Sequence, residues 1–320
     1  MSHVISPELV ALGEVLIDFT QAGFSASGQA LFERNAGGAP ANVAVQAARL
    51  GMSAQFVGKV GADMHGDFLR RSLQERGVDV SSVAQDPDAF TTLAFVEVDP
   101  RTAERSFSFA RKPGADTQLR WDELDRTILD GTRVFHFGTL SLTDEPARTA
   151  TQKAVAYARA AGKLITYDPN YRAPLWKTEQ AAKEQMLWGL QQADVVKISD
   201  EEVRFLWGCT PEEGADRVLA LGAKLAMVTL GPEGCYLKNR NAAVRASSPK
   251  VHPVDTTGAG DIFGGSAVAQ LLDTGKAPED LTEAELLQIA RFAATAASLS
   301  TETLGGIPSI PKKEAVLARM

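Results

Sequence analysis

The chain has 320 residues, slightly more than the size at which one hydrophobic core usually stops growing, so we expect one large domain with a small appendage. Hydrophobic residues make up 44% and charged residues 23%, and the net charge of −7 argues against nucleic-acid binding, which usually needs a basic face. No apolar run is long enough to span a bilayer, and the N-terminus does not resemble a secretory signal. Because Cys209 and Cys235 also lack metal-ligand spacing, we expect a cytoplasmic protein with reduced thiols.

Apolar runs alternate with amphipathic segments along most of the chain. The run LVALGEVLIDF (9–19) is typical of one buried parallel strand, and a glycine pair then precedes an alanine-rich helix that Gly51 can terminate. Further strands are predicted at 53–61, 133–138, 163–170, 194–199 and 225–231. Further helices are predicted at 64–77, 145–161, 178–192, 211–221, 260–273 and 283–299. Strands separated by helices form parallel βαβ units, so the pattern predicts an α/β fold with helices on both faces of a sheet.

Residues 91–111 break this alternation, because two extended runs flank DPRTA with no helix between them. Together with 19–36, this hairpin predicts a small β lid on a single domain spanning 1–320, and such a flap can cover a ligand. A decorative edge hairpin is the alternative. Exposed edge strands invite pairing, so the lid also predicts a homodimer. The apolar residues expected on its surface are Phe95, Val96, Phe107 and Phe109.

The stretch DTTGAGD (255–261) places a turn of small residues directly before a long apolar helix. The first amides of a helix lack partners within it, so the N–H groups of 258–261 predict an anion site. Asp261 would repel that anion unless it faces a hydroxyl that loses its proton while attacking phosphorus, as in phosphoryl transfer. An ordinary capped helix is the alternative. The spacing G-x-G-x-x-x-G is not a dinucleotide fingerprint, and no Walker A loop occurs in the sequence.

Two motifs in this order, GGAPANVAVQAARLG (37–51) and DTTGAGD, resemble those of the ribokinase-like sugar kinases, the PfkB carbohydrate kinase family. The resemblance runs from about Val10 to Pro311, and GEVLIDF, AERSFSFARKPGAD, DPNYRAPLW and VKISDEE look most like fructokinases. It implies a three-layer αβα sandwich with a mostly parallel central sheet and a small β-sheet lid. It also implies transfer of the γ-phosphoryl group of ATP to the 6-hydroxyl of D-fructose, with Mg²⁺, and with K⁺ as the monovalent cation found in many members.

Carried over position by position, the resemblance makes Asp261 the base for the sugar hydroxyl. The anion hole is then formed by Gly258, Ala259 and Gly260. Substrate-binding positions are matched by Asp18, Gly37, Gly38, Asn42, Arg111, Asn170 and Arg172. ATP-binding positions are matched by Lys197, Glu202, Thr229, Gly231 and Gly234, with Glu202 also serving the magnesium–phosphate network indirectly. A monovalent-cation site is matched by Asp255, Thr257, Gly305 and Ser309.

Two positions depart from the family pattern. Ser199 stands where the family has the asparagine of an Asn-x-x-Glu motif, and Ala110 stands where fructokinases often carry a tyrosine, which leaves the exact sugar open. A 2-keto-3-deoxygluconate kinase is the nearest alternative, because its carboxylate substrate would use Arg111 and Arg172 as charge partners. Another ribokinase-like sugar or nucleoside kinase is a further alternative. A binding module without turnover is disfavoured by Asp261, and an NAD-linked dehydrogenase is disfavoured by the glycine spacing.

Overall fold

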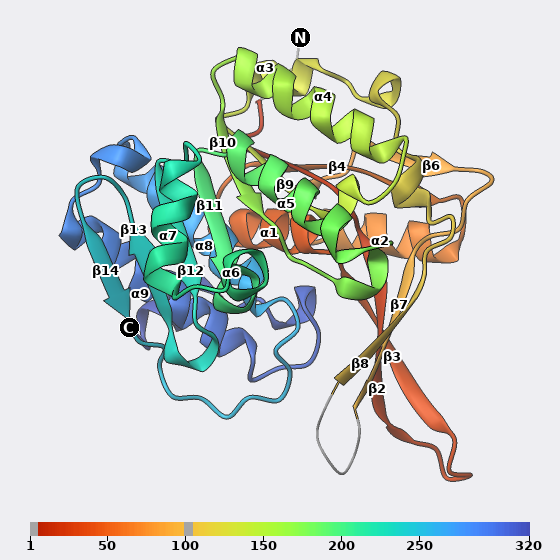
Figure 1. Ribbon diagram of the computed structural model, residues 1–320. Helices are drawn as coiled ribbons and strands as arrows, with labels where there is room; N and C mark the ends of the chain where they lie inside the picture. The colour runs from red at the N-terminus through yellow and green to blue at the C-terminus, as the bar shows by residue number, and fades with distance from the viewer. Residues whose placement is uncertain (1–5, 99–104) are drawn as a thin grey trace.

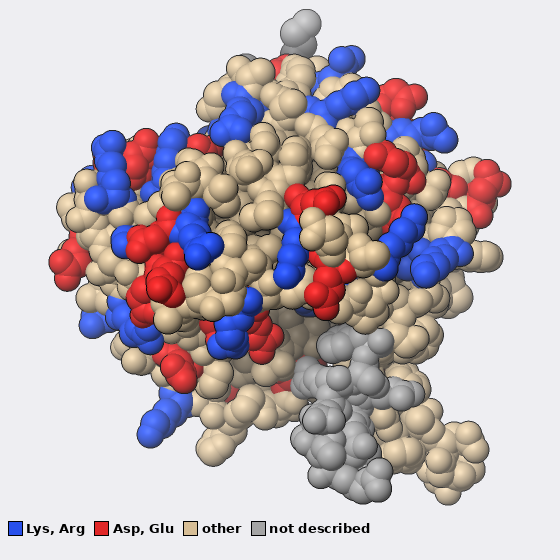
Figure 2. All heavy atoms as spheres, viewed as in Figure 1, with Lys and Arg blue, Asp and Glu red and all other residues tan. Residues whose placement is uncertain are grey.

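The computed structural model describes residues 6–98 and 105–320. Its main body has three layers, with helices on both faces of a large sheet, and a second, smaller sheet projects from this body (Figure 1). Lysine, arginine, aspartate and glutamate side chains are interspersed over the face drawn in Figure 2. Within the described ranges, no helix combines the length and apolar character that crossing a bilayer requires.

The central sheet contains ten described strands and is mostly parallel. Their order across the sheet is β14 (Ala243–Ala246), β13 (Cys235–Lys238), β12 (Leu225–Thr229), β11 (Val195–Ser199), β10 (Leu164–Asp168), β9 (Val134–Gly138), β1 (Leu9–Leu12), β4 (Ala54–Gly61) and β5 (Val78–Asp79), with β6 (Val83–Asp86) also paired to β4. Among the described strands of this sheet, the pairings of β12 with β13 and of β13 with β14 are antiparallel, and the others are parallel. The predicted parallel α/β sheet is therefore confirmed.

Successive residues of the central strands point to opposite faces, and each face has its own core. Val10 and Leu12 of β1 belong to one core, whereas Leu9 and Ala11 belong to the other. The first core is covered by α3 (Thr127–Gly131), α4 (Ala147–Ala160), α5 (Glu179–Gln192), α6 (Asp200–Trp207) and α7 (Pro211–Ala220). The opposite face is covered by α1 (Ala39–Arg49), α2 (Met64–Gln74), α8 (Ala259–Thr274), α9 (Glu283–Ser300) and α10 (Lys313–Leu317).

The small sheet has four strands in the order β3 (Ala30–Gly37), β2 (Leu16–Phe24), β7 (Leu93–Val98) and β8 (Arg105–Ala110). The hairpin predicted at 91–111 is present as β7 and β8, and its turn at 99–104 lies outside the described residues. The expected apolar surface is partly wrong, since Val96 is buried and Phe95 stacks on Phe19. The side chain of Phe107 is outside the described part.

The prediction of one strand over 9–19 is wrong. The chain leaves the central sheet at Gly13 and enters the small sheet as β2. Gly13 has φ 155°, and a side chain there would meet the Pro40 ring at 2.6 Å, so this position requires glycine. Both halves are apolar and buried, which is why hydrophobicity alone does not separate them. The antiparallel strands β13 and β14 were not predicted either, because each has only four residues.

Candidate active site

The turn before α8 is shaped to leave main-chain amides free of side chains. Gly258 precedes the helix in the left-handed conformation, with φ 78°, and no side chain caps the helix start. A Cβ atom on Gly260 would lie 2.7 Å from Lys197 Nζ, so the ammonium group packs directly against this turn. Because the first amides of a helix have no helical partner, the turn can accept an anion backed by a positive charge.

Asp261, in the first turn of α8, is buried, with 6% of its surface exposed. Its Oδ2 accepts a hydrogen bond of 2.7 Å from Asn42 Nδ2 on α1. Burial, with a further contribution from Asp168, raises the pKa of Asp261 to about 6, against the opposing effects of Lys197, Asn42 and Arg172. A carboxylate with this pKa is ionised at neutral pH and can still take up a proton readily.

Asp18 approaches the same region from β2 of the small sheet. Its carboxylate lies against Gly37, where an added Cβ would come within 1.9 Å of Asp18 Oδ2. Burial raises its pKa to about 7, Arg172 acts in the opposite direction, and Asp261 and Asp255 raise it further. Asp18 therefore interacts electrostatically with three other charged groups, two of which are the carboxylates that flank the glycine turn.

Gly38 shapes the start of α1 next to this acid. It has φ 108°, and a Cβ atom there would lie 2.5 Å from the carbonyl oxygen of Glu14. The glycine pair thus lets the end of β3 and the start of α1 approach β2 and the loop between β1 and β2 closely. Asn42 follows one turn later on α1 and faces α8.

A buried ion pair lies beneath the glycine turn. Lys197 Nζ, on β11, is 2.9 Å from Asp168 Oδ2 at the end of β10. Both side chains are almost inaccessible to solvent, so the pair is fixed by burial. Lys197 packs against Gly260 of the glycine turn; Gly260 lines a neighbouring cavity, whereas Lys197 does not.

Glu202 anchors the loop that follows β10. Its carboxylate accepts hydrogen bonds from Tyr171 N at 2.7 Å and from Ser199 N at 2.8 Å. Ser199 in turn caps α6 by accepting from Glu202 N, so serine at the family's asparagine position completes a capping box. This places Arg172 where its charge acts on both Asp18 and Asp261.

Asn170 lies in the same loop and takes the left-handed conformation with φ 44°, which asparagine tolerates better than most residues. Its N–H donates to Asp168 Oδ1 at 3.1 Å.

Arg111, which follows β8, is held in a buried network. It pairs with Asp116 at 2.6 Å and donates to Thr143 Oγ1 at 2.8 Å and to the Leu140 carbonyl at 2.9 Å. Most N–H donors of its guanidinium group are thus already hydrogen-bonded within the protein. The described contacts tie the base of the small sheet to the loop after β9 and do not bring Arg111 to Asp261.

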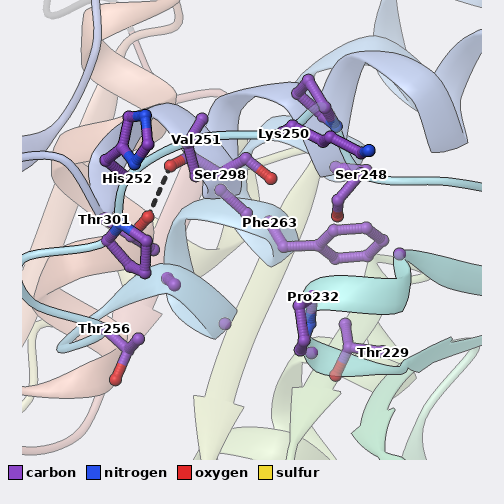
Figure 3. A pocket seen from close by; sticks show the side chains of 18 residues that line it. Thr229, Pro232, Ser248, Lys250, Val251, His252, Thr256, Phe263, Ser298 and Thr301 are labelled. Carbon is purple, nitrogen blue, oxygen red and sulfur yellow. Dashed lines mark hydrogen bonds between the residues drawn. The ribbon is translucent and has the colours of Figure 1, made fainter.

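A cavity of about 720 Å³ adjoins the glycine turn and is lined mainly by apolar groups. Figure 3 shows Phe263 of α8 between Lys250 and Ser248 on one side and Pro232 and Thr229 on the other. The predicted nucleotide residues Thr229, Gly231 and Gly234 line it, as do Ala259 and Gly260 of the turn. A cavity with apolar walls that ends at an anion site suits a purine nucleotide with its phosphates at the turn.

Asp255 ties the glycine turn to the C-terminal segment. Its Oδ1 accepts from Thr257 N and its Oδ2 from Gly305 N, both at 2.8 Å. Gly305 has φ 82°, and Ser309, slightly further on, donates to the Gly306 carbonyl. The four residues predicted around a monovalent cation therefore belong to two segments that meet at this carboxylate.

Sequence reasoning missed several residues of the site. Glu14 is buried, its Oε1 accepts from Ala39 N at 3.0 Å, and burial raises its pKa to about 7. Asp168 ends β10, within the strand predicted at 163–170, and an acid near the carboxyl end of a parallel strand is a signal that could have identified it. Phe263 and the loop carrying Lys250 gave no comparable signal, because apolar and loop residues are common throughout the chain.

The chain is similar to known proteins over almost its whole length. The sequence matches the description "pfkB family carbohydrate kinase" over residues 6–313. It is 42% identical to Fructokinase-1 of Zea mays, over 97% of this chain and 96% of the relative. Among solved structures, it resembles a fructokinase with bound ATP from Xylella fastidiosa, with a TM-score of 0.89 and 32% identity over 97% of each chain.

It also resembles a fructokinase from Vibrio cholerae O395 bound to fructose, ADP and a calcium ion, with a TM-score of 0.87 and 30% identity, covering 98% of this chain and 99% of that one. The predicted ribokinase-like fold, with its small separate sheet, is confirmed. The match over almost the whole chain and the shared fold show that this protein belongs to the PfkB family of carbohydrate kinases.

Proposed function

We propose that the protein is a fructokinase that transfers the γ-phosphoryl group of ATP to the 6-hydroxyl of D-fructose. The observation that carries this proposal is the position of buried Asp261 beside a turn whose Ala259 and Gly260 also line the nucleotide-sized cavity. The substrates are supported by the fructokinase relatives, one of which binds ATP and another fructose and ADP.

In the proposed mechanism, Asp261 accepts the proton of the sugar hydroxyl while the hydroxyl oxygen bonds to the γ-phosphorus. The bond from that phosphorus to the β–γ bridging oxygen breaks, and ADP leaves with the electron pair. The main-chain N–H groups of the turn 258–260 stabilise the transferring group, and Lys197 adds a positive charge behind them. All of these groups are fixed by the fold before the substrates arrive, which is how electrostatic stabilisation is most effective.

We place the sugar between the small sheet and the start of α8. Asp18, Gly37, Gly38 and Asn42 would contact its hydroxyls, with Asn170 and Arg172 on the opposite side. A carboxylate and an amide can each bridge a pair of hydroxyls. Of the two arginines that the carboxylate of 2-keto-3-deoxygluconate would use, Arg111 is already paired with Asp116, which favours a neutral sugar. Arg172 lies beside Asp18 and Asp261 and is available to either substrate.

We propose Mg²⁺ as the ion that accompanies ATP. The described part of the chain holds no cluster of three His, Cys, Asp or Glu side chains that could bind a metal. This fits Mg²⁺, which usually keeps several waters and binds through substrate phosphates. Asp168 and Glu202 would hold it indirectly, and the ion would neutralise phosphate charge. Since Lys197 and Glu202 lie away from the cavity lining, their role toward ATP would be to support the loop and the turn.

We propose K⁺ as a monovalent cation near Asp255, Thr257, Gly305 and Ser309. The donors available there are the buried Asp255 carboxylate and main-chain carbonyl oxygens, and carbonyl oxygens suit such ions. A bound cation would hold the two segments together and order the turn that follows Thr257.

We further propose that the small sheet acts as a lid over the sugar and as the contact of a homodimer. Its outer strand β3 is an edge, and the large apolar side chains of Phe24 and Leu31 are 63% and 49% exposed. Light scattering tests the dimer, and a strictly monomeric mass would contradict it. The cytoplasmic location expected from the sequence stays a prediction.

The activity is tested by a coupled ADP-release assay over a panel of sugars and keto acids. We expect D-fructose to be preferred and Asp261→Ala to lower kcat by about 10²–10⁴-fold without loss of fold. Asp273→Ala, which removes an exposed acid from the same helix, is the matched control and should leave turnover unchanged. Near-normal turnover by Asp261→Ala would show that another group is the base.

A further inference from the structure

The two helices that meet at the site are joined by a buried hydrogen bond. Asn42 Nδ2, on α1, donates to Asp261 Oδ2, on α8, at 2.7 Å. The two residues are 3% and 6% exposed, so water does not compete for this bond. A hydrogen bond to an ionised group in such surroundings is stronger than one between neutral groups.

The Asn42 amide is also packed from two other directions. A Cβ atom on Gly258 would lie 3.2 Å from Asn42 Nδ2, and one on Gly306 would lie 3.0 Å from it. The amide thus sits between the start of α8 and the C-terminal turn, with little room for another rotamer. An ionised carboxylate only accepts hydrogen bonds, so the amide nitrogen must face Asp261.

The oxygen of the same amide is then left without a hydrogen-bond donor. Asn42 Oδ1 is buried, and no group of the described protein donates to it. An orphaned buried acceptor is costly unless a ligand supplies the donor. A sugar hydroxyl beside Asp261 would supply one.

We propose that Asn42 is a positioning residue for Asp261, fixing one carboxylate oxygen so that the other faces the reacting hydroxyl, while its own Oδ1 accepts from the bound sugar. This inference rests on the proposed role of Asp261 as the base. It differs from a role as a sugar ligand alone, because a ligand would act on sugar affinity and a positioning residue acts on the chemical step. The hydrogen bond also stabilises the charged form of Asp261.

The test compares Asn42→Ala with Gln46→Ala. Gln46 lies one turn further along α1 and donates to Ser266 Oγ of α8 at 2.7 Å, so it joins the same two helices without touching the base. We expect Asn42→Ala to lower kcat about ten- to hundredfold, the equivalent of one lost hydrogen bond to a charged group, and to move the acidic limb of the pH–rate profile to higher pH. Gln46→Ala should leave both kcat and the pH profile unchanged.

Two further variants separate the possible causes. Asn42→Asp keeps the size of the side chain but places a second carboxyl beside Asp261, so it should move the acidic limb further toward high pH than Asn42→Ala does. Asn42→Ala should also cost almost nothing further in kcat when Asp261 is already alanine, because residues that act as a unit are not additive. Circular dichroism and thermal unfolding establish that each variant is folded.

The inference is overturned if Asn42→Ala raises only the KM for fructose, with kcat and the pH profile unchanged, since Asn42 would then be a sugar ligand alone. It is also overturned if Gln46→Ala shows the same losses, which would indicate an effect of helix packing. If the losses in kcat caused by Asn42→Ala and by Asp261→Ala add fully in the double variant, Asn42 does not act through Asp261, and the inference is again overturned. Normal turnover by Asp261→Ala would instead refute the base assignment itself, and that failure is distinct from the other three.

Discussion

Gly37 is the position where one added methyl group should act most selectively on the site. It ends β3 without a positive φ, so alanine can adopt its backbone conformation. The added Cβ would lie 1.9 Å from Asp18 Oδ2 and 2.8 Å from Asp18 Cγ, whereas ordinary van der Waals contact begins at 3.4 Å. The Asp18 carboxylate must therefore move by about 1.5 Å in Gly37→Ala.

A displacement of that size breaks any hydrogen bond between Asp18 and the sugar. A hydrogen bond to a charged group contributes about 1.5–3 kcal/mol, which corresponds to a loss in kcat/KM for fructose of about ten- to 150-fold. The KM for ATP should stay the same, because the cavity is lined by 229–234, the loop at 248–253, α8 and α9 and not by β3. Initial rates of ADP release, with fructose varied at saturating ATP and then the reverse, measure both quantities.

Gly264→Ala is the matched control for this variant. Gly264 lies in α8, and a Cβ atom added there has nothing within 4 Å. Alanine should therefore stabilise the helix by about 1 kcal/mol while leaving both KM values unchanged. If Gly37→Ala keeps the KM for fructose within about twofold of wild type, or raises the KM for ATP equally, Asp18 does not hold the sugar as proposed.

Three further predictions follow from the buried charges. Activity should fall as pH drops from about 7 through 6, because Asp18 and Asp261 must be ionised and burial raises their pKa values to about 7 and about 6; a kcat/KM profile that is flat down to pH 5 would contradict this. Glu14 has a pKa of about 7 in the folded protein and an ordinary value of 4.5, so its protonated form contributes about 3 kcal/mol to stability below pH 4.5, a contribution lost as pH rises through 7. Between pH 5 and pH 8, the ligand-free wild type should lose about 2–3 kcal/mol more stability in urea unfolding than Glu14→Gln, because the loss that comes from Asp18 and Asp261 is common to both proteins. Equal pH dependence in the two proteins would refute the prediction. Arg111→Ala should lower the free energy of unfolding by about 3–5 kcal/mol, because Asp116 would remain buried and unpaired; a folded variant of normal stability that has only a higher KM for fructose would instead make Arg111 a sugar ligand.

The parts of the fold that the sequence predicts best are those with strong periodicity and clear boundaries. The helix predicted at 260–273 is observed as α8, and the one predicted at 283–299 as α9, because each is long, apolar on its buried side and bounded by a turn. The boundary between β1 and β2 could not be predicted from hydrophobicity, because both strands are apolar and buried although they belong to different sheets. Its only local sign is Gly13, and a single glycine has many structural uses.

The site was predictable where a motif fixes local backbone, and less so where residues meet through the fold. The small-residue turn before Asp261 follows directly from its sequence. The contact between Asn42 and Asp261 joins positions 219 residues apart, so only packing of α1 against α8 creates it. Arg111 shows the reverse case, because the family resemblance implied a substrate contact for it, while nothing in the sequence identified Asp116 as its ion-pair partner.

Only three residues separate the end of β1 from the start of β2, and Asp18 is the third residue of β2. If the small sheet moves as a lid, this short piece of backbone would be its hinge and would also carry Asp18, the acid proposed to bind the sugar. Swinging that sheet outward would withdraw the acid from its ligand in the same movement. Opening of the lid and release of the phosphorylated sugar would then be coupled, whereas the nucleotide, bound in a cavity lined by other segments, would dissociate independently.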